Sequence, residues 1–260
     1  MCVACGCSNS TFSLAPPVQH TRRDGARTLS VEEAVLAEND RYARINRKLL
    51  AARGITALNF LSSPGSGKTT LLVNTIKALA SRYSIGVIEG DQQTDRDAAR
   101  IRETGAAAVQ INTGKGCHLD ALMVGRSFDQ LGLHDDGLLF IENVGNLVCP
   151  AEFDLGESAK VVILSVTEGE DKPLKYPNMF HAADVVLINK IDLLPHLTFD
   201  MTQCREYIKR VNSRAPIISV SATHGEGMTQ WLEWIEASHR AKSLDPSLAS
   251  PGDRQIGGTT

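Results

Sequence analysis

Short apolar runs alternate with segments of helical periodicity from Ile55 to about Glu236. The apolar runs predict strands centred on Leu58, Val87, Val109, Phe140, Val162, Val186 and Ile218. The segments at helical spacing predict helices near residues 71–80, 96–104, 119–131, 201–212 and 228–238. Strands that alternate with helices build a mostly parallel sheet with helices on both faces, so we predict an α/β fold. Ligands of such folds gather at the carboxyl ends of the strands.

Three further segments flank this alternating region. The sequence Ser30-Val31-Glu32-Glu33 is typical of a capping box, and it predicts a helix that packs on the flank of the sheet domain. Residues 8–29 are polar and carry two adjacent prolines, so we expect a flexible linker there. Residues 241–260 are rich in Ser, Pro, Gly and Thr, and we expect a disordered tail. The globular domain should therefore cover residues 30–240.

Composition excludes several classes of partner. The chain has 260 residues, with 27 Lys and Arg against 30 Asp and Glu, and it contains no basic block suited to nucleic acid or an anionic membrane. Apolar runs stay short of a membrane span, and the N-terminus lacks the pattern of a signal peptide. We therefore expect a cytoplasmic protein whose six cysteines are metal ligands or core residues and not disulfides.

A phosphate-binding loop connects the first predicted strand to the following helix. After Leu61 the sequence is Ser-Ser-Pro-Gly-Ser-Gly-Lys-Thr-Thr, and small residues let successive backbone N–H groups surround phosphates. Lys68 should reach the β- and γ-phosphates, while the Thr69 hydroxyl should bind Mg²⁺. Ser62 replaces the glycine that usually begins this pattern. The residues expected to contact the phosphates are Gly65, Ser66, Gly67, Lys68, Thr69 and Thr70.

A second motif predicts that the base is guanine. The strand around Val186 ends in Asn189-Lys190-Ile191-Asp192. The Asp192 carboxylate can accept two hydrogen bonds from guanine, whereas adenine offers no such donor pair and would leave the carboxylate unpaired. Asn189 can bond the other edge of the base, and the Lys190 stem can lie along its face. Ser221-Ala222 resembles the element that supports guanine in many GTPases, so we expect GTP and GDP as ligands.

Two acids that follow strands are candidate magnesium ligands beside Thr69. Asp91 ends one apolar run, and Glu142 ends another with Gly145 three residues later. Glu-x-x-Gly departs from the more common Asp-x-x-Gly, but the layout is that of a loop that senses the γ-phosphate. No residue stands out for activating the attacking water, which predicts slow GTP hydrolysis. The expected catalytic residues are therefore Lys68, Thr69, Asp91 and Glu142.

Cys117, His118 and Cys149 follow two of the predicted strands, in loops at the nucleotide edge. Two thiolates and an imidazole suit Ni²⁺ or Zn²⁺. The residues alone leave open the alternative of a polar loop without metal. A metal in this place would be thermodynamically coupled to the nucleotide, because each would change the affinity for the other.

The N-terminus carries the pattern Cys-x-x-Cys-x-Cys, formed by Cys2, Cys5 and Cys7. Three thiolates on a mobile segment can wrap one soft ion without a preformed pocket, and removal of Met1 would free an amine suited to square-planar Ni²⁺. A redox-sensitive or incidental cluster is the alternative. Cys204 stands alone within a helical pattern and should be a core or surface residue.

Together these motifs resemble the HypB family of hydrogenase nickel-incorporation GTPases. The similar segments are the N-terminal cysteines, Ser-Ser-Pro-Gly-Ser-Gly-Lys-Thr-Thr-Leu-Leu, Glu-Gly-Asp-Gln-Gln-Thr-Asp, Gly-Cys-His-Leu, Glu-Asn-Val-Gly-Asn-Leu-Val-Cys-Pro and Asn-Lys-Ile-Asp. The resemblance implies a P-loop NTPase fold of the SIMIBI type and a GTP-dependent metallochaperone for the large subunit of nickel–iron hydrogenase. It also implies a HypA-type nickel-binding partner and a nucleotide-dependent homodimer with the Cys117, His118 and Cys149 site near its interface.

Other functions remain as alternatives at this point. A urease-type nickel GTPase is one, although the N-terminal cysteine motif does not resemble that family. A metal storage or sensor module with an inactive nucleotide site is another, and Lys68, Thr69 and Asp192 argue against it. A small-molecule kinase is disfavoured by Asn-Lys-Ile-Asp.

Overall fold

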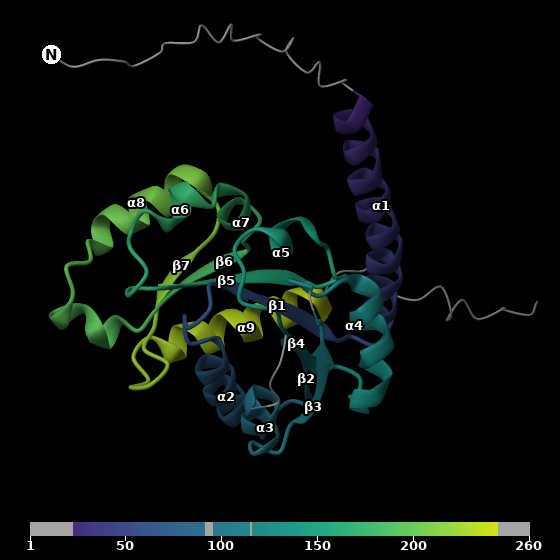
Figure 1. Cartoon of the computed structure of the whole chain (residues 1–260). Coiled ribbons are helices and arrows are strands. Elements are labelled where there is room, and N and C mark those ends of the chain that lie inside the picture. Colours follow the sequence, from purple (N-terminus) through teal and green to yellow (C-terminus); the bar gives the residue numbers. More distant parts are fainter. Residues whose placement is uncertain (1–22, 92–95, 115, 244–260) are drawn as a thin grey trace, which may run out of the picture. The chain divides into compact units, whose positions relative to one another are not determined.

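A seven-stranded parallel sheet organises the molecule, in the order β3-β2-β4-β1-β5-β6-β7 (Figure 1). The computed structural model describes residues 23–91, 96–114 and 116–243, with side chains described within 33–90, 96–114 and 116–241. All seven predicted strands are confirmed. Their bounds are β1 Thr56–Ser62, β2 Ile85–Asp91, β3 Ala107–Asn112, β4 Leu138–Glu142, β5 Ala159–Ser165, β6 Val185–Asn189 and β7 Ile217–Ser219.

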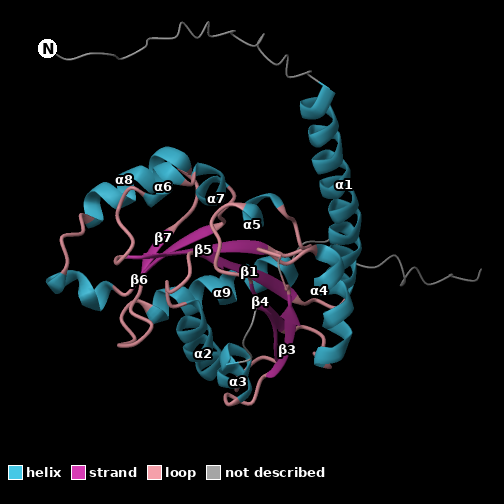
Figure 2. Cartoon of the chain, in the orientation of Figure 1, coloured by secondary structure: helices cyan, strands magenta, loops and turns pink. Residues whose placement is uncertain are grey.

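Helices cover both faces of the sheet (Figure 2). Helices α2, α3 and α9 pack on one face, while α4, α7, α8 and the end of α1 pack on the other. None of the helices within the described residues is long and apolar enough to span a membrane. The helices are α1 Arg23–Ala52, α2 Lys68–Leu79, α3 Arg96–Arg102, α4 Ala121–Phe128, α5 Cys149–Glu152, α6 Lys172–Lys175, α7 Pro177–His181, α8 Met201–Val211 and α9 Met228–Ser243, with 3₁₀ turns η1 Asp129–Leu131 and η2 Ile191–His196.

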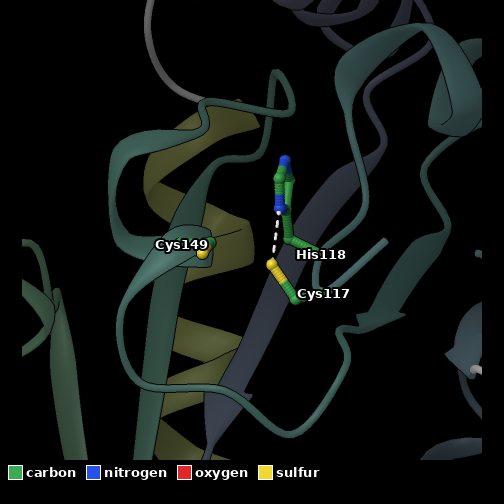
Figure 3. A group of neighbouring side chains, drawn as sticks. All are labelled: Cys117, His118 and Cys149. Atoms are coloured by element: carbon green, nitrogen blue, oxygen red, sulfur yellow. Dashed lines mark hydrogen bonds between the residues drawn. The ribbon is translucent and has the colours of Figure 1, made fainter. Parts of the chain in front are cut away.

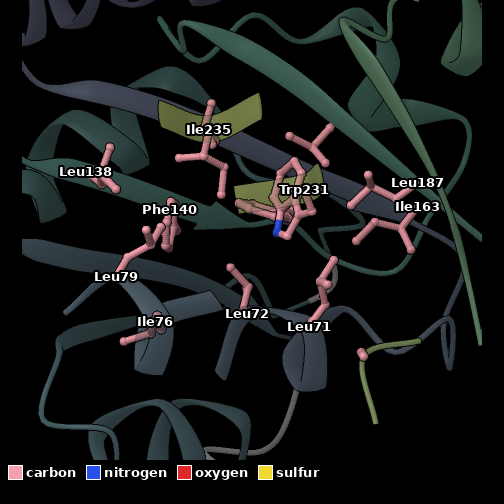
Figure 4. Close-up of a cluster of buried hydrophobic side chains, with 14 of the residues drawn as sticks. Leu71, Leu72, Ile76, Leu79, Leu138, Phe140, Ile163, Leu187, Trp231 and Ile235 are labelled. Carbon is pink, nitrogen blue, oxygen red and sulfur yellow. The ribbon is translucent and has the colours of Figure 1, made fainter. Parts of the chain in front are cut away.

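Aromatic packing fixes α2 and α9 against the sheet. Trp231 of α9 is fully buried in the core (Figure 4). Its ring meets that of Phe60 edge-on at 6.0 Å between centroids. The Trp231 indole N–H donates to the Thr75 hydroxyl at 2.9 Å, so the polar atom of this large side chain is satisfied inside the core. The helix that begins at Lys68 is therefore held in a fixed place against the sheet.

The start of α1 differs from the prediction. The helix begins at Arg23, and Ser30 lies inside it. Ala26 and Leu29 favour helix, and no proline occurs between residue 18 and Ser30, so the capping box does not have to mark the first turn. The described part of the chain divides into two units, one up to Val35 and one from Leu36 onward. The motif at residues 1–7, most of the linker and nearly all of the tail lie outside the described residues.

Candidate functional site

The phosphate loop lies between β1 and α2 and borders a cavity of about 590 Å³. Gly65 and Gly67 have positive φ angles of 74° and 94°, which side chains rarely adopt. A Cβ atom on Gly67 would also lie 2.6 Å from the Asn189 side-chain nitrogen, so only glycine fits. The cavity is lined by residues 64–70 of the loop, by Glu89, Gly90, Asp97 and Arg100, by residues 142–145, and by Lys190.

Ser62, the departure from the usual loop pattern, has a defined contact. Its side chain is fully buried, and its hydroxyl accepts a hydrogen bond of 3.1 Å from the Lys68 ammonium. The hydroxyl itself donates to the carbonyl of Ser63 at 2.7 Å. Serine in this place therefore holds the lysine beside the phosphate loop.

Glu142 lies at the end of β4 and contacts the loop directly. One of its carboxyl oxygens accepts a 2.7 Å hydrogen bond from the Thr69 hydroxyl. Among the described residues the other oxygen, which is also buried, has no hydrogen-bond partner. Burial raises the pKa of Glu142, and the nearby Lys68 cation partly opposes this. A buried acid beside a threonine hydroxyl fits Mg²⁺, which prefers hard oxygen ligands.

The side chain of Asp91, the other predicted magnesium ligand, lies outside the described side chains. Glu89, which is not among the predicted site residues, lies beside Glu142 in the register of β2 and β4 and is 3 % exposed. An acid within the apolar run Val87-Ile88-Glu89 is the signal in the sequence that points to it. Arg100, also outside the predicted set, lines the cavity and donates to the Thr70 hydroxyl at 3.1 Å.

The predicted guanine motif is tied to the phosphate loop. The Asn189 amide donates to the Ser66 carbonyl at 2.9 Å, and the Lys190 ammonium donates to the Gly65 carbonyl at 2.6 Å. The Asn189 oxygen accepts from the backbone N–H of Ala222 at 3.2 Å. These bonds bring the phosphate loop, the motif and the Ser221-Ala222 element together.

Asp192 keeps an ionised carboxylate at the end of this motif. The Ser221 hydroxyl donates to it at 2.5 Å and lowers the pKa of Asp192. The His224 ring nitrogen lies 3.5 Å from the other carboxylate oxygen. A carboxylate in this state is the form that accepts hydrogen bonds from a base.

Cys117, His118 and Cys149 meet at one point, although they come from two segments (Figure 3). Their ligand atoms all lie within 4.8 Å of one another, and Cys117 Sγ is 3.5 Å from His118 Nδ1. Cys149 is the first residue of α5 and not part of a loop as predicted. Phe153, which is not among the predicted site residues, packs its ring on the His118 ring at 3.9 Å between centroids.

The chemistry of this cluster suits a borderline-soft metal. Partial burial lowers the pKa of His118, which favours the neutral imidazole that binds metals. The neighbouring Cys149 thiol raises the pKa of Cys117, so a metal must displace a proton from the thiol. Within the described residues this is the one group of three such side chains that could hold a metal ion. Cys204 is a core residue, and burial raises its pKa to about 12.

Comparisons with known proteins identify a family. Residues 56–219 match the family described as CobW/HypB/UreG, nucleotide-binding domain. The chain is 64 % identical over 217 residues to a protein named hydrogenase maturation factor HypB from Azotobacter chroococcum mcd 1. The match covers 84 % of this chain and 71 % of that protein.

Solved structures agree in fold. HypB from Helicobacter pylori in complex with nickel is 40 % identical, with a TM-score of 0.76 over 80 % of this chain and 98 % of that one. FlhF complexed with GTP and Mg²⁺ is 14 % identical, with a TM-score of 0.50 over 68 % of this chain and 73 % of that one. The second likeness concerns the fold alone.

Proposed function

This chain belongs to the HypB family of hydrogenase maturation factors, and we propose that it is a GTP-hydrolysing metallochaperone that inserts Ni²⁺ into the large subunit of nickel–iron hydrogenase. Its nucleotide-binding domain has the P-loop NTPase fold of the SIMIBI type. The observation that carries the proposal is the position of Cys149. It follows Glu142 by seven residues, so one segment contributes both to the nucleotide cavity and to the thiol–imidazole cluster.

GTP is the nucleotide that this site should prefer. Asp192 is ionised and supported by Ser221, while Asn189 is held between the phosphate loop and Ala222. Guanine would satisfy the carboxylate with two donors, and adenine would leave it unpaired. Lys68 would contact the β- and γ-phosphates from beside Ser62.

Thr69 and Glu142, together with Asp91, would hold Mg²⁺. When bound, this ion neutralises charge that develops on the phosphate oxygens during hydrolysis. The chain's own residues orient the triphosphate through backbone N–H groups and the Lys68 ammonium. Since no described side chain stands out as a base for the attacking water, intrinsic turnover should be slow.

Nickel is the proposed cargo, bound in two places. Cys117, His118 and Cys149 form one site, which Zn²⁺ could also occupy. Cys2, Cys5 and Cys7 form the other, in the part of the chain that the structure does not describe. The nickel complex of the Helicobacter pylori relative supports nickel binding by this family. We further propose a HypA-type partner, a nucleotide-dependent homodimer and a cytoplasmic location.

Hydrogenase maturation in cells tests the proposal. A host that makes a nickel–iron hydrogenase and lacks its own HypB would receive this chain or its Lys68→Ala variant. We expect the unaltered chain to restore nickel to the purified large subunit, and the variant to fail because it cannot hold the triphosphate. A large subunit that stays without nickel, although the purified chain hydrolyses GTP, would overturn the maturation role. An absence of GTP hydrolysis would instead favour a metal storage protein.

A further inference from the structure

We propose that Asn143 is the positioning residue through which the nucleotide state reaches the metal-binding cluster. This inference rests on the proposed function, because it assumes that Cys117, His118 and Cys149 bind nickel. Asn143 directly follows Glu142, which contacts the phosphate loop through Thr69. Its own side chain contacts the residue that directly follows His118. One side chain thus touches both segments that would have to move together.

The Asn143 carboxamide oxygen accepts two backbone hydrogen bonds. The N–H of Leu119 donates at 3.1 Å, and the N–H of Val144 donates at 3.0 Å. Asn143 is 1 % exposed, so water cannot readily replace either bond. The backbone that carries His118 is therefore attached to the segment that follows β4.

Two further residues fix the orientation of the Asn143 amide. Its nitrogen donates to the Asn59 oxygen at 3.4 Å, and the Asn59 nitrogen donates to a Glu157 oxygen at 3.1 Å. Asn59 and Glu157 are both buried. A flipped Asn143 amide would point its N–H groups at the two backbone donors, so this orientation is the one that satisfies all partners.

The segment after Asn143 also contacts both sites. A Cβ atom on Gly145 would lie 2.9 Å from Pro64 Cα, which places this backbone directly against the phosphate loop. On the other side the Asn146 amide donates to the Cys117 carbonyl at 3.3 Å. A γ-phosphate that displaces residues 142–145 must therefore either move Leu119 with them or break a buried hydrogen bond. The loss of one such bond is enough to change a binding constant by about tenfold.

Nickel titration in defined nucleotide states tests this role. The full-length chain would carry alanine at Cys2, Cys5 and Cys7. The thiolate-to-nickel charge-transfer absorbance then reports nickel bound to Cys117, His118 and Cys149, here called the internal cluster. Nickel affinity would be measured with GDP and Mg²⁺ and with a non-hydrolysable GTP analogue and Mg²⁺. We expect the two affinities of this parent protein to differ by about fivefold or more. Asn143→Ala should reduce the ratio to within about twofold of unity.

Two variants separate this role from general stability. Asn143→Asp keeps an oxygen that accepts from Leu119 but loses the donor to Asn59, so its ratio should lie between those of the parent and of Asn143→Ala. Asn212 offers a control, because its carboxamide oxygen also accepts two backbone hydrogen bonds, from Arg214 and Ala215 at 3.1 Å each. Its amide donates to the carbonyls of Phe180 and Ala183 around the end of α7, away from both sites, so Asn212→Ala should lower stability and leave the ratio unchanged.

The nickel affinities of the parent protein and of Asn143→Ala test two separate claims, the coupling itself and the role of Asn143 in it. If the parent protein binds nickel equally in both states, the coupling assumed in the proposed function is absent. A parent ratio that survives in Asn143→Ala overturns the role of Asn143 alone. Hydrogen exchange of the Leu119 amide in the unaltered protein needs no variant. We expect its protection to differ between the two nucleotide states, and equal protection would contradict the proposal.

Discussion

Burial of the Glu142 carboxyl group lowers the stability of the folded chain, and the same group is a proposed magnesium ligand. Burial raises its pKa, so the ionised form destabilises the folded chain at neutral pH. The Thr69 hydroxyl and the Lys68 cation offset part of this cost, and a bound Mg²⁺ would offset more. The residue thus keeps an acid where folding alone would favour a neutral side chain.

Glu142→Gln should stabilise the nucleotide-free protein and abolish GTP hydrolysis. Because the folded pKa is raised, the stability that Glu142 contributes when protonated is lost as pH rises through that pKa. The variant should therefore exceed the parent in thermal unfolding at pH 8, by roughly 1–2 kcal/mol, and by less at pH 5. Glu152→Gln, an exposed control, should change stability little at either pH. An equal gain at both pH values would argue against a buried ionised carboxylate.

Asp192→Asn should weaken the preference for guanine. The amide cannot accept both guanine donors, so GDP affinity should fall about 10- to 100-fold while ADP affinity changes little. Competition of each nucleotide against a fluorescent GDP derivative measures this. Asp200 is a suitable control because it caps α8 by accepting from Gln203 and lies outside the cavity lining. If Asp192→Asn keeps the same preference for GDP over ADP, the guanine assignment is wrong.

The short helix α5 positions two side chains of the internal cluster. Cys149 begins this four-residue helix, and Phe153 directly follows its end. The helix thus presents a candidate thiol ligand and, one turn later, the ring that packs on His118. Contacts of this kind orient a metal ligand without touching the metal.

Phe153→Ala should lower nickel affinity at the internal cluster by about tenfold, because the His118 ring loses the surface that orients it. Titration of the full-length chain with alanine at Cys2, Cys5 and Cys7 measures this. Phe199 is a matched control, since it is also partly buried but packs in the core under α7 and α8. If Phe199→Ala weakens nickel binding equally, the effect comes from stability and not from the His118 contact.

Elements differ in how well the sequence predicts them. The strands follow from continuous apolar runs, and the phosphate loop and guanine motif follow from residues at fixed spacing. Helices α5, α6 and α7 have only four or five residues, which is too short for a helical period to repeat. The side-chain contacts of Asn143 and Phe153 depend on how distant segments pack. No local pattern in the sequence encodes them.

At the scale of the whole molecule, three parallel strands bring the two candidate sites together. The loops after β1, β3 and β4 supply the phosphate loop, the Cys117-His118 pair and the segment from Asn143 to Cys149. Since parallel strands end at the same edge of a sheet, residues far apart in sequence become neighbours there. Cys2, Cys5 and Cys7 are far in sequence from Cys117, so substitutions can test the two proposed metal sites one at a time.

Cys2→Ala should remove the tighter nickel site of the full-length chain and leave the internal one. The N-terminal motif offers three thiolates, and the internal cluster offers two thiolates with one imidazole. Competition with a chromophoric chelator measures the number and affinity of sites. Cys149→Ser should instead remove the internal site and leave the tighter N-terminal one. Persistence of that tighter site in Cys2→Ala would rule out the N-terminal assignment.

The bonds from Asn189 and Lys190 to the phosphate loop are formed between the protein's own side chains and backbone. The guanine motif and the phosphate loop are therefore held at a fixed spacing before GTP binds. Little conformational entropy of the chain should be lost when GTP binds. Capture of GTP from solution should then be limited by diffusion and charge, and exchange by the rate at which GDP departs.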